Sequence, residues 1–204
     1  MTTISLLVHD GFADLDVFIP LDVLNRVNAK DWNVNIVGTA PVHRSKLGVA
    51  VETNAGLDAI ASSDVVLIAG GLGSRNCLQS PEFMNALRFA PDRQLIGSQC
   101  SGVLILAKTG MLQGHSATTT KSAKGELQSM GIEVLDQPFV SHGNVATAGG
   151  CLAALYLASW VLYRLAGVSE ARRALDQMLP DGESDFFLDK IEAVVLREGC
   201  DPEL

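Results

Sequence analysis

Residues 95–104 read Leu-Ile-Gly-Ser-Gln-Cys-Ser-Gly-Val-Leu, and within them a buried strand passes into a helix with almost no connecting residues. The residue at the joint is Cys100, and small residues stand on both sides of it. A side chain at the apex of so tight a turn is forced outward from a strained backbone, and small neighbours relieve the crowding. The motif is not Gly-x-Ser-x-Gly, so its match to a nucleophile elbow is partial. The pattern nevertheless predicts that Cys100 is a nucleophile held on a strand-to-helix turn.

The position of Cys100 also predicts an ionised thiol. A thiol at a helix N-terminus faces unpaired backbone N–H groups and the positive end of the helix dipole, and both are expected to lower its pKa. The backbone N–H of Ser101 points toward an anion that develops beside the sulfur. The alternative is that Cys100 is a small buried hydrophobic residue, as most free cysteines are.

Strands and helices alternate along the rest of the chain. Several strands are apolar at every position, most clearly residues 64–69, which argues for a mostly parallel sheet covered by helices on both faces. With no long linker, repeat or low-complexity segment, we expect one α/β domain over residues 1–204. Other expected strands are residues 4–8, 33–37, 49–53 (an edge strand or hairpin arm), 94–98, 139–141 and 144–147; expected helices are 15–27, 81–89, 101–108, 122–130, 149–165, 169–179 and 185–197.

Ligands of an open α/β sheet bind beyond the carboxyl ends of its strands, so we look for function in three joints, residues 9–16, 70–76 and 98–102. The second joint begins Gly70-Gly71-Leu72-Gly73. A dinucleotide site would need the spacing Gly-x-Gly-x-x-Gly, and Asn76 stands where the third glycine should be. The glycines either let backbone N–H groups approach a small substrate as an oxyanion pocket, or form a plain tight turn.

Four acidic residues follow the first strand. Asp10 is expected in the turn, Asp14 as a cap of the next helix and Asp22 on the solvated face of that helix. Asp16 is expected at the same edge of the sheet as Cys100. A carboxyl group buried beside a thiolate has a raised pKa, so a protonated Asp16 would donate a hydrogen bond to sulfur or a proton to a substrate.

Charge and hydropathy exclude several classes of partner. The chain has 204 residues with a formal net charge of -8 and no cluster of Lys and Arg, so it repels phosphate backbones and a nucleic-acid partner is not expected. The N-terminal apolar run is too short for a signal peptide, and the longest apolar run, residues 151–162, is well below the roughly 20 residues of a membrane span. We expect a cytoplasmic protein that does not enter a membrane.

The other cysteines lack an activating context. No pair has Cys-x-x-Cys spacing and no histidine lies at ligand spacing from a cysteine, so we predict neither a zinc site nor thioredoxin-type chemistry, and no metal or cofactor. Cys151 begins an apolar helix and is expected in the core. Cys77 is expected in a loop and Cys200 near the end of the chain, where either thiol is exposed to oxidants without being catalytic.

Several motifs follow one another in order along nearly the whole chain. They are Leu15-Asp16-Val17, Pro20-x-Asp22-Val23-Leu24, Ile68-Ala69-Gly70-Gly71, residues 100–107, Gly110-Met111-Leu112-Gln113-Gly114, Ala117-Thr118-Thr119 and residues 143–150. Together they resemble the ThiJ/PfpI superfamily, and the resemblance implies the class I glutamine amidotransferase-like fold, a flavodoxin-like three-layer sandwich. It also implies that Cys100 is the nucleophile, that Asp16 is its acidic partner, and that the N–H groups of Gly71 and Ser101 are oxyanion donors, with Gly70 in the same substrate-binding loop.

Within the superfamily the chain looks like the isonitrile hydratase branch, because Asp16 is not Glu and a hydroxyl residue, Ser101, follows the cysteine. Protease-like members carry His at that position, so we do not expect a peptidase. The resemblance implies that the thiolate attacks an isocyanide carbon, that Asp16 protonates or activates water, and that an N-substituted formamide leaves. Relatives often have His directly after Ala-Thr-Thr, where this chain has Thr120, which argues against a Cys–His mechanism; His115 and His142 are expected to be surface or turn residues.

Other functions remain open beside a cysteine-dependent hydratase or hydrolase of small molecules. One is a redox or stress-responsive protein in which Cys100 is oxidised to a sulfinate that Asp16 holds by a hydrogen bond. Another is a ligand-sensing domain, since relatives of this type are fused to helix-turn-helix regulators, although the sequence to Leu204 holds no such module. Superfamily members are commonly dimers, so a homodimer is expected.

Overall fold

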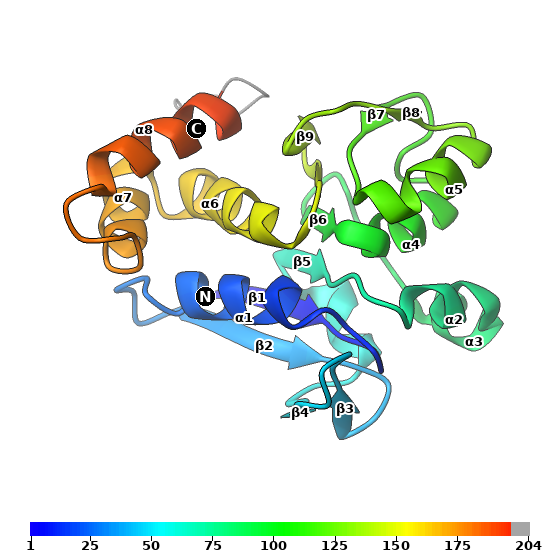
Figure 1. The fold of residues 1–204 in the computed structure, drawn as a ribbon. Coiled ribbons are helices and arrows are strands. Elements are labelled where there is room, and N and C mark those ends of the chain that lie inside the picture. The colour runs from blue at the N-terminus through cyan, green and yellow to red at the C-terminus, as the bar shows by residue number, and fades with distance from the viewer. Residues whose placement is uncertain (197–204) are drawn as a thin grey trace.

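The computed structural model describes residues 1–196. Six strands form one sheet in the order β2-β1-β5-β6-β10-β9 (Figure 1). All neighbouring strands are parallel except β10 and β9, which form an antiparallel hairpin. The arrangement confirms the predicted mostly parallel sheet. The strands are β1 (Thr2–Leu7), β2 (Trp32–Val37), β5 (Val65–Ile68), β6 (Leu95–Gln99), β9 (Phe139–His142) and β10 (Val145–Ala148).

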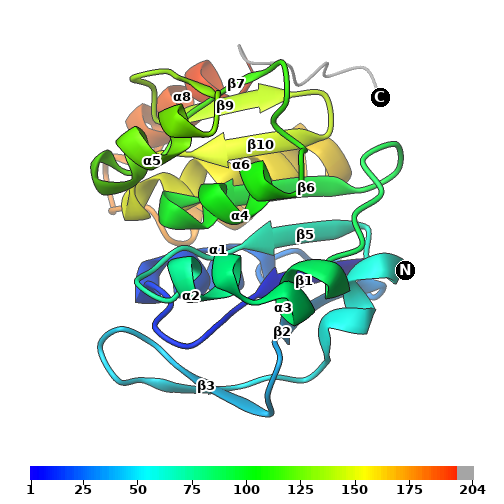
Figure 2. The ribbon, with the colours of Figure 1, turned by 90° about the vertical axis from the view of Figure 1, so that its right-hand side faces the viewer.

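Helices cover both faces of this sheet and make the three layers of the predicted sandwich (Figures 1 and 2). On one face lie α1 (Asp14–Leu24), α6 (Ala154–Leu165), α7 (Val168–Asp176) and α8 (Ser184–Val195). On the other face lie the 3₁₀ turn η1 (Leu57–Ser62) and the helices α2 (Ser74–Gln79), α3 (Pro81–Ala86), α4 (Val103–Lys108) and α5 (Lys124–Ser129). The two faces carry separate hydrophobic clusters.

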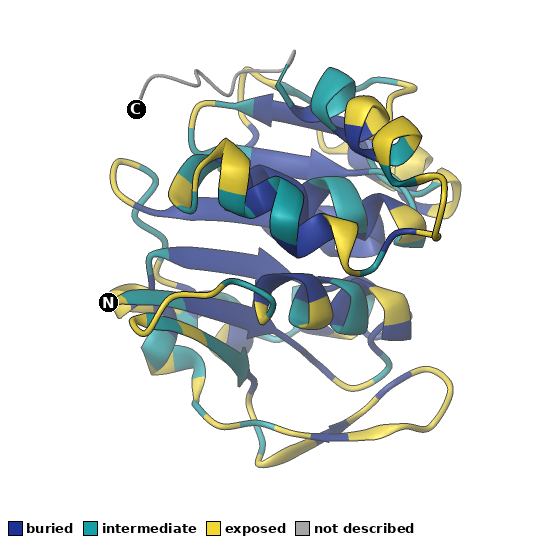
Figure 3. Ribbon diagram, turned by 90° about the vertical axis from the view of Figure 1, so that its left-hand side faces the viewer, coloured by how far each residue is buried: buried dark blue, intermediate teal, exposed yellow. Residues whose placement is uncertain are grey.

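Strand β5 explains why its sequence is apolar at every position. Val65 and Leu67 belong to the hydrophobic cluster on the α6 face, whereas Val66 and Ile68 belong to the cluster on the α4 face. Side chains alternate across a strand, so a strand covered on both faces needs no polar position. Figure 3 shows the central strands as the buried layer of the molecule.

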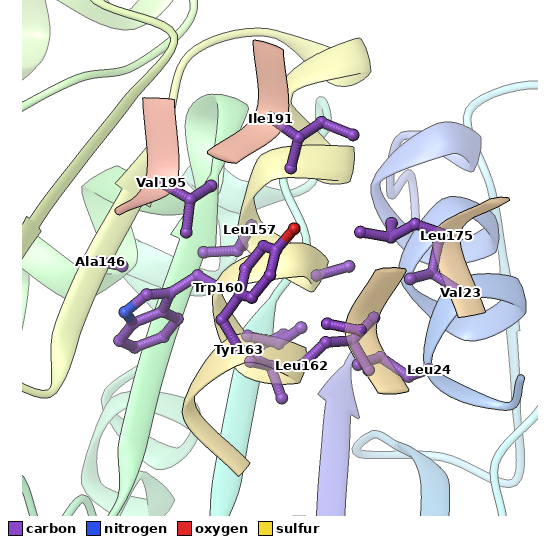
Figure 4. Packing of buried hydrophobic residues seen from close by; sticks show 14 of the residues in the cluster. Val23, Leu24, Ala146, Leu157, Trp160, Leu162, Tyr163, Leu175, Ile191 and Val195 are labelled. Carbon is purple, nitrogen blue, oxygen red and sulfur yellow. The ribbon is translucent and has the colours of Figure 1, made fainter. Parts of the chain in front are cut away.

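Helix α6 is the centre of the first cluster, as Figure 4 shows. Trp160 is fully buried, and its ring lies 6.3 Å from the ring of Phe139 on the edge strand β9. Leu157 and Leu162 on the same helix are also buried, and α7 and α8 pack against α6 from outside. Each large side chain buried in this way contributes roughly 1.5–3 kcal/mol to stability.

Some elements were not predicted because they are too short to show a period. The expected segment 49–53 is the arm β4 (Ala50–Glu52) of a hairpin whose other arm, β3 (Val42–Arg44), was missed. This hairpin extends away from the sheet (Figure 2). The six-residue helix α2 was also missed, as was the parallel pair β7 (Ser116–Ala117) and β8 (Glu133–Val134).

The predicted helix over residues 149–165 begins instead as the 3₁₀ turn η4 (Cys151–Ala153) before α6. The expected helix over residues 185–197 corresponds to α8, and its last residue, like Cys200, lies outside the described residues. No helix within residues 1–196 is long and apolar enough to cross a bilayer.

Candidate active site at the carboxyl edge of the sheet

The predicted elbow is present where β6 ends. The 3₁₀ turn η2 (Cys100–Gly102) follows β6 directly and leads into α4. Cys100 has φ 50, and among residues 1–196 it is the only residue other than glycine with a positive φ. This left-handed conformation costs an ordinary residue about 1–2 kcal/mol, which the surrounding contacts must offset.

Glycines in two loops make room for the elbow. A Cβ atom on Gly70 would lie 2.6 Å from the Cβ of Cys100, and one on Gly102 would lie 2.7 Å from the carbonyl oxygen of Ala69. The loops after β5 and β6 are therefore in direct contact. Thr119 fixes the elbow from a third segment, because its hydroxyl donates to the carbonyl oxygen of Cys100 at 2.5 Å.

Asp16 lies in the first turn of α1, and its side chain is buried at the elbow. The Cys100 thiol donates to Oδ1 at 3.4 Å, and the backbone N–H of Gly70 donates to Oδ2 at 2.9 Å. Both carboxyl oxygens are held, so the acid has one orientation relative to the sulfur. The structure thus brings together the two residues on which the sequence-based hypothesis depends.

Burial and the neighbouring charge of Asp16 raise the pKa of the Cys100 thiol above its ordinary value. Burial likewise raises the pKa of Asp16. The prediction that the helix N-terminus lowers the thiol pKa is therefore wrong, because desolvation and the adjacent carboxylate outweigh the favourable dipole. The resting site holds a thiol, and that thiol has a carboxyl group within reach to accept its proton.

Cys151 was expected in the core, and that prediction is wrong. It lies in η4, is only partly buried, and its Sγ is 3.5 Å from the Sγ of Cys100. Ligand atoms of Asp16, Cys100 and Cys151 all lie within 4.8 Å of one another. The residues that follow Cys151 in the sequence are apolar, so nothing in the sequence indicates that its thiol lies beside Cys100.

Cys77 was expected in a loop, and this prediction is also wrong. It lies in α2, is buried, and packs with the hydrophobic cluster on the α4 face. Burial raises the pKa of Cys77 to about 11. It is a core thiol without a role in the site.

Gly71 and Ser101 bind each other. The N–H of Gly71 donates to the Ser101 hydroxyl oxygen at 2.9 Å, and that hydroxyl donates to the carbonyl of Gly71 at 2.8 Å. Gly71 has φ 135, and a Cβ there would lie 2.2 Å from the carbonyl oxygen of Gly11, so only glycine fits. Its N–H reaches a substrate only after the Ser101 hydroxyl turns away, and its role as an oxyanion donor stays a prediction.

A buried polar chain behind the elbow was missed from the sequence. The Ser74 hydroxyl lies 3.3 Å from that of Ser101 and 3.3 Å from Nε2 of His9, whose Nδ1 lies 3.0 Å from the carbonyl oxygen of Asp10. Burial lowers the pKa of His9, so its imidazole is neutral at pH 7. His9 stands in the first of the three predicted joints, which was the available signal for it.

A cation and a cavity complete the surroundings. Burial, followed by the charge of Asp16, raises the pKa of Cys151, and burial raises the pKa of Asp16; the charge of Lys46, in the turn of the β3–β4 hairpin, opposes both shifts without reversing them. A cavity of about 530 Å³ borders the site through Thr119 and Gly150. It is lined by Thr118, Thr119, Thr120, Lys121, Lys124, Val134, Leu135, Asp136, Gln137, Gly149 and Gly150.

The other predicted acids lie apart from the sulfur chemistry. Asp10 accepts a hydrogen bond from the backbone N–H of Arg44, and Asp22 is exposed and paired with Arg26. Asp14 does not cap α1, because Ala13 is the N-cap residue and no side chain caps it. Asp14 is instead buried, and neither of its carboxyl oxygens has a hydrogen-bond partner.

The histidines flagged in the sequence also lie apart from the sulfur chemistry. The rings of His115 and His142 stack on each other 4.6 Å apart, and Nε2 of His142 lies 2.9 Å from the carbonyl oxygen of Ser116. Thr120, which follows Ala117-Thr118-Thr119, lines the cavity.

Comparison with known proteins places this geometry in a family. The chain is 28% identical over 172 residues to an isonitrile hydratase of Pseudomonas putida, covering 83% of this chain and 74% of that protein. It is 27% identical over 162 residues to a glutathione-independent glyoxalase DJ-1 of Schizosaccharomyces pombe, covering 74% and 84% of the two chains. The crystal structure of Drosophila melanogaster DJ-1beta superposes with a TM-score of 0.76 at 26% identity, covering 87% of this chain and 97% of that one. The model of the DJ-1/PfpI family matches residues 2–163, so the chain belongs to the DJ-1/PfpI family.

Proposed function

We propose that this protein is a cysteine-dependent hydratase that converts an isocyanide and water into an N-substituted formamide, with Cys100 as nucleophile and Asp16 as acid and base. One observation carries the proposal: the Cys100 sulfur and the Asp16 Oδ1 lie 3.4 Å apart. A carbon atom placed about 3.5 Å from each, the distance of a near-attack geometry, is within reach of both groups at once.

An isocyanide suits such a pair because its terminal carbon accepts a nucleophile and a proton on the same atom. In the first step the Cys100 sulfur bonds to that carbon, and Asp16 takes the thiol proton and delivers it to the same carbon, giving R–N=CH–S–Cys100. The neutral resting thiol is appropriate here, since the thiol proton becomes the new C–H hydrogen. Asp16, acting as general base, makes the sulfur nucleophilic during the reaction, so the resting thiol does not need a lowered pKa.

Hydrolysis of the thioimidate releases the product. Asp16 takes a proton from water as the water oxygen adds to the carbon, and it passes that proton to the nitrogen, giving R–NH–CH(OH)–S–Cys100. Asp16 then takes the hydroxyl proton as the carbon–sulfur bond breaks, and it delivers this proton to the sulfur. The sum is R–NC plus H₂O giving R–NH–CHO, with the enzyme regenerated.

Two further features support this proposal over a reaction of the Cys–His type. Ser101 follows the cysteine, Thr120 stands at the position where relatives often carry His, and within residues 1–196 no histidine belongs to the cluster of Asp16, Cys100 and Cys151. The alkyl or aryl group of the isocyanide would extend into the cavity that begins at Thr119 and Gly150.

The test is turnover of an isocyanide panel in D₂O and in H₂¹⁸O. The mechanism predicts formamide with deuterium on the formyl carbon and one ¹⁸O in its carbonyl. Cys100→Ala should abolish turnover, and Asp16→Asn should lower kcat by about 10²–10⁴-fold. Cys77→Ser is the matched control, because it removes a buried thiol that takes no part in the site.

A 2-oxoaldehyde is assayed in parallel. Turnover of the 2-oxoaldehyde without turnover of any isocyanide would show that the chain shares the activity named for the fission-yeast relative, and the hydratase proposal would fail. Formation of formamide without deuterium at the formyl carbon would exclude the proton path through Asp16.

A further inference from the structure

The side chains of Asp16, Cys100 and Cys151 converge from three parts of the chain. Asp16 comes from the first turn of α1, Cys100 from the elbow and Cys151 from η4. The two sulfur atoms are 3.5 Å apart, and the Cys100 sulfur is 3.4 Å from the Asp16 Oδ1. The hydratase mechanism uses Asp16 and Cys100 and gives no role to Cys151.

These separations match the edges of a tetrahedral metal site. A tetrahedral Zn²⁺ with Zn–S bonds of about 2.3 Å and a Zn–O bond of about 2.0 Å places its sulfurs about 3.8 Å apart and sulfur about 3.5 Å from oxygen. The observed distances differ from these edges by 0.3 Å or less. A disulfide would instead bring the two sulfurs to about 2.05 Å, well inside the observed separation.

We propose that Asp16, Cys100 and Cys151 form a three-ligand site for a thiophilic divalent cation of the Zn²⁺ type, with a fourth position open to water. Two thiolates and a carboxylate favour Zn²⁺ over Mg²⁺ or Ca²⁺, which take oxygen ligands, and the carboxylate favours it over Cu(I). As the ion binds, each thiol loses its proton to solvent, so the bound ion with its three protein ligands carries one negative charge.

The surroundings meet two further requirements of a metal site. The second carboxyl oxygen of Asp16 is held by the Gly70 N–H at 2.9 Å, an outer hydrogen bond of the kind that orients a ligating carboxylate. The positive charge of Lys46 favours the ionised forms of Asp16 and Cys151, and it would partly balance the negative charge of the metal complex. Within residues 1–196 no fourth His, Cys, Asp or Glu joins the cluster, and the partly exposed Cys151 leaves the site open on its side.

This site goes beyond the proposed hydration and opposes it, because coordination to the metal lowers the nucleophilicity of the Cys100 sulfur and fills the space beside it. The metal would therefore act as a reversible inhibitor of Cys100. The proposal stands on the three ligand positions and does not depend on which substrate the thiol attacks.

The experiment is a Co²⁺ titration of the fully reduced, metal-free protein, with both thiols first verified as free by mass spectrometry. We expect one equivalent of Co²⁺ to give the near-ultraviolet sulfur-to-cobalt charge-transfer band and the visible bands of a tetrahedral ion, and Zn²⁺ to displace it. Cys151→Ser and Asp16→Asn should each weaken binding by at least about 100-fold, more than the loss of an outer hydrogen bond would. Cys77→Ser should leave the spectrum unchanged.

Protection of the thiol gives a second readout. One equivalent of Zn²⁺ should slow alkylation of Cys100 in the wild type and should not do so in Cys151→Ser, whose fold is checked by circular dichroism. Absence of the charge-transfer band, or a band that survives Cys151→Ser, overturns the site. The isocyanide assay is run separately in chelator-treated buffer, so a failure of hydration leaves the cobalt result intact, and the reverse also holds.

Discussion

The side chain of Cys100 fills the space beside Gly70 that any other residue's side chain would need: a Cβ built on Gly70 would lie 2.6 Å from the Cβ of Cys100. The N–H of the same glycine holds Asp16. One residue therefore admits the nucleophile and orients its acid, although neither role depends on a side chain.

Gly70→Ala should consequently destabilise the fold by about 1–3 kcal/mol, since the contact is with backbone and a Cβ that cannot move freely. It should also lower the rate of Cys100 alkylation relative to the wild type at a temperature where both are folded. Gly125→Ala is the control, because no atom lies within 4 Å of its added Cβ. Equal thermal stability of Gly70→Ala and the wild type would contradict the contact.

Thr119→Val should loosen the elbow. The change keeps the shape of the side chain and removes the hydroxyl that donates to the Cys100 carbonyl, at an expected cost of about 1–2 kcal/mol in unfolding free energy. Thr109→Val removes a similar hydroxyl-to-carbonyl bond, to Leu106 at the other end of α4, and serves as the matched variant. We expect only Thr119→Val to change the alkylation rate of Cys100, measured by peptide mass spectrometry.

Asp16→Asn should make the Cys100 thiol more acidic. Burial is the main reason that the pKa of this thiol is raised, and the charge of Asp16 is the next. Removing that charge leaves the burial, lowers the thiol pKa and shifts the pH profile of iodoacetamide alkylation toward lower pH. A profile that stays in place, or moves to higher pH, would show that Asp16 is uncharged in the resting protein.

His9 should make stability fall as the pH drops below about 6.5. Its pKa is lowered in the folded protein, so below 6.5 the unfolded chain takes up a proton that the folded chain refuses. The free energy of unfolding then decreases by at most about 1.4 kcal/mol per pH unit, until the lowered pKa of the folded state is reached. His9→Gln should show a shallower decline between pH 6.5 and 5 in thermal melts, and an unchanged slope would exclude His9 as the source.

The two tryptophans should respond differently to replacement by phenylalanine. The indole N–H of Trp160 is buried without a hydrogen-bond partner, whereas that of Trp32 donates to the carbonyl of Leu24 at 2.8 Å. Loss of the indole N–H in Trp160→Phe should therefore change the free energy of unfolding little. In Trp32→Phe, loss of the hydrogen bond should lower the free energy of unfolding by about 1 kcal/mol more. Trp160→Ala, which empties the core shown in Figure 4, should cost about 3–5 kcal/mol by denaturant unfolding.

Asp16 and Cys100 could be expected at one edge of the sheet from the sequence, because parallel strands bring their carboxyl ends together there, but their direct contact could not. That argument needs only local patterns: a buried strand, a short joint and the residues that follow. The same reasoning identified Gly70 as part of the site. It was expected in a substrate-binding loop, whereas in the structure its N–H donates to the Asp16 carboxylate.

Cys151 could not be found in this way. It opens an apolar segment that has the composition of a core helix, and its contact with Cys100 joins positions 51 residues apart. The direction of the Cys100 pKa shift was likewise out of reach, because desolvation depends on how α1 and the loops pack over the sulfur. Local sequence indicated the helix dipole, which is the weaker of the opposing effects here.

Cys100 precedes η4, the element that contacts it, along the chain, and this order has a consequence for synthesis on the ribosome. Strand β10 joins the sheet beside β6, and η4 and α6 follow it along the chain. A growing chain therefore carries Cys100 before the segment around residue 150 has emerged to cover it. During that interval the thiol lacks part of its shelter, so nascent chains should be the form of this protein that electrophiles label most readily.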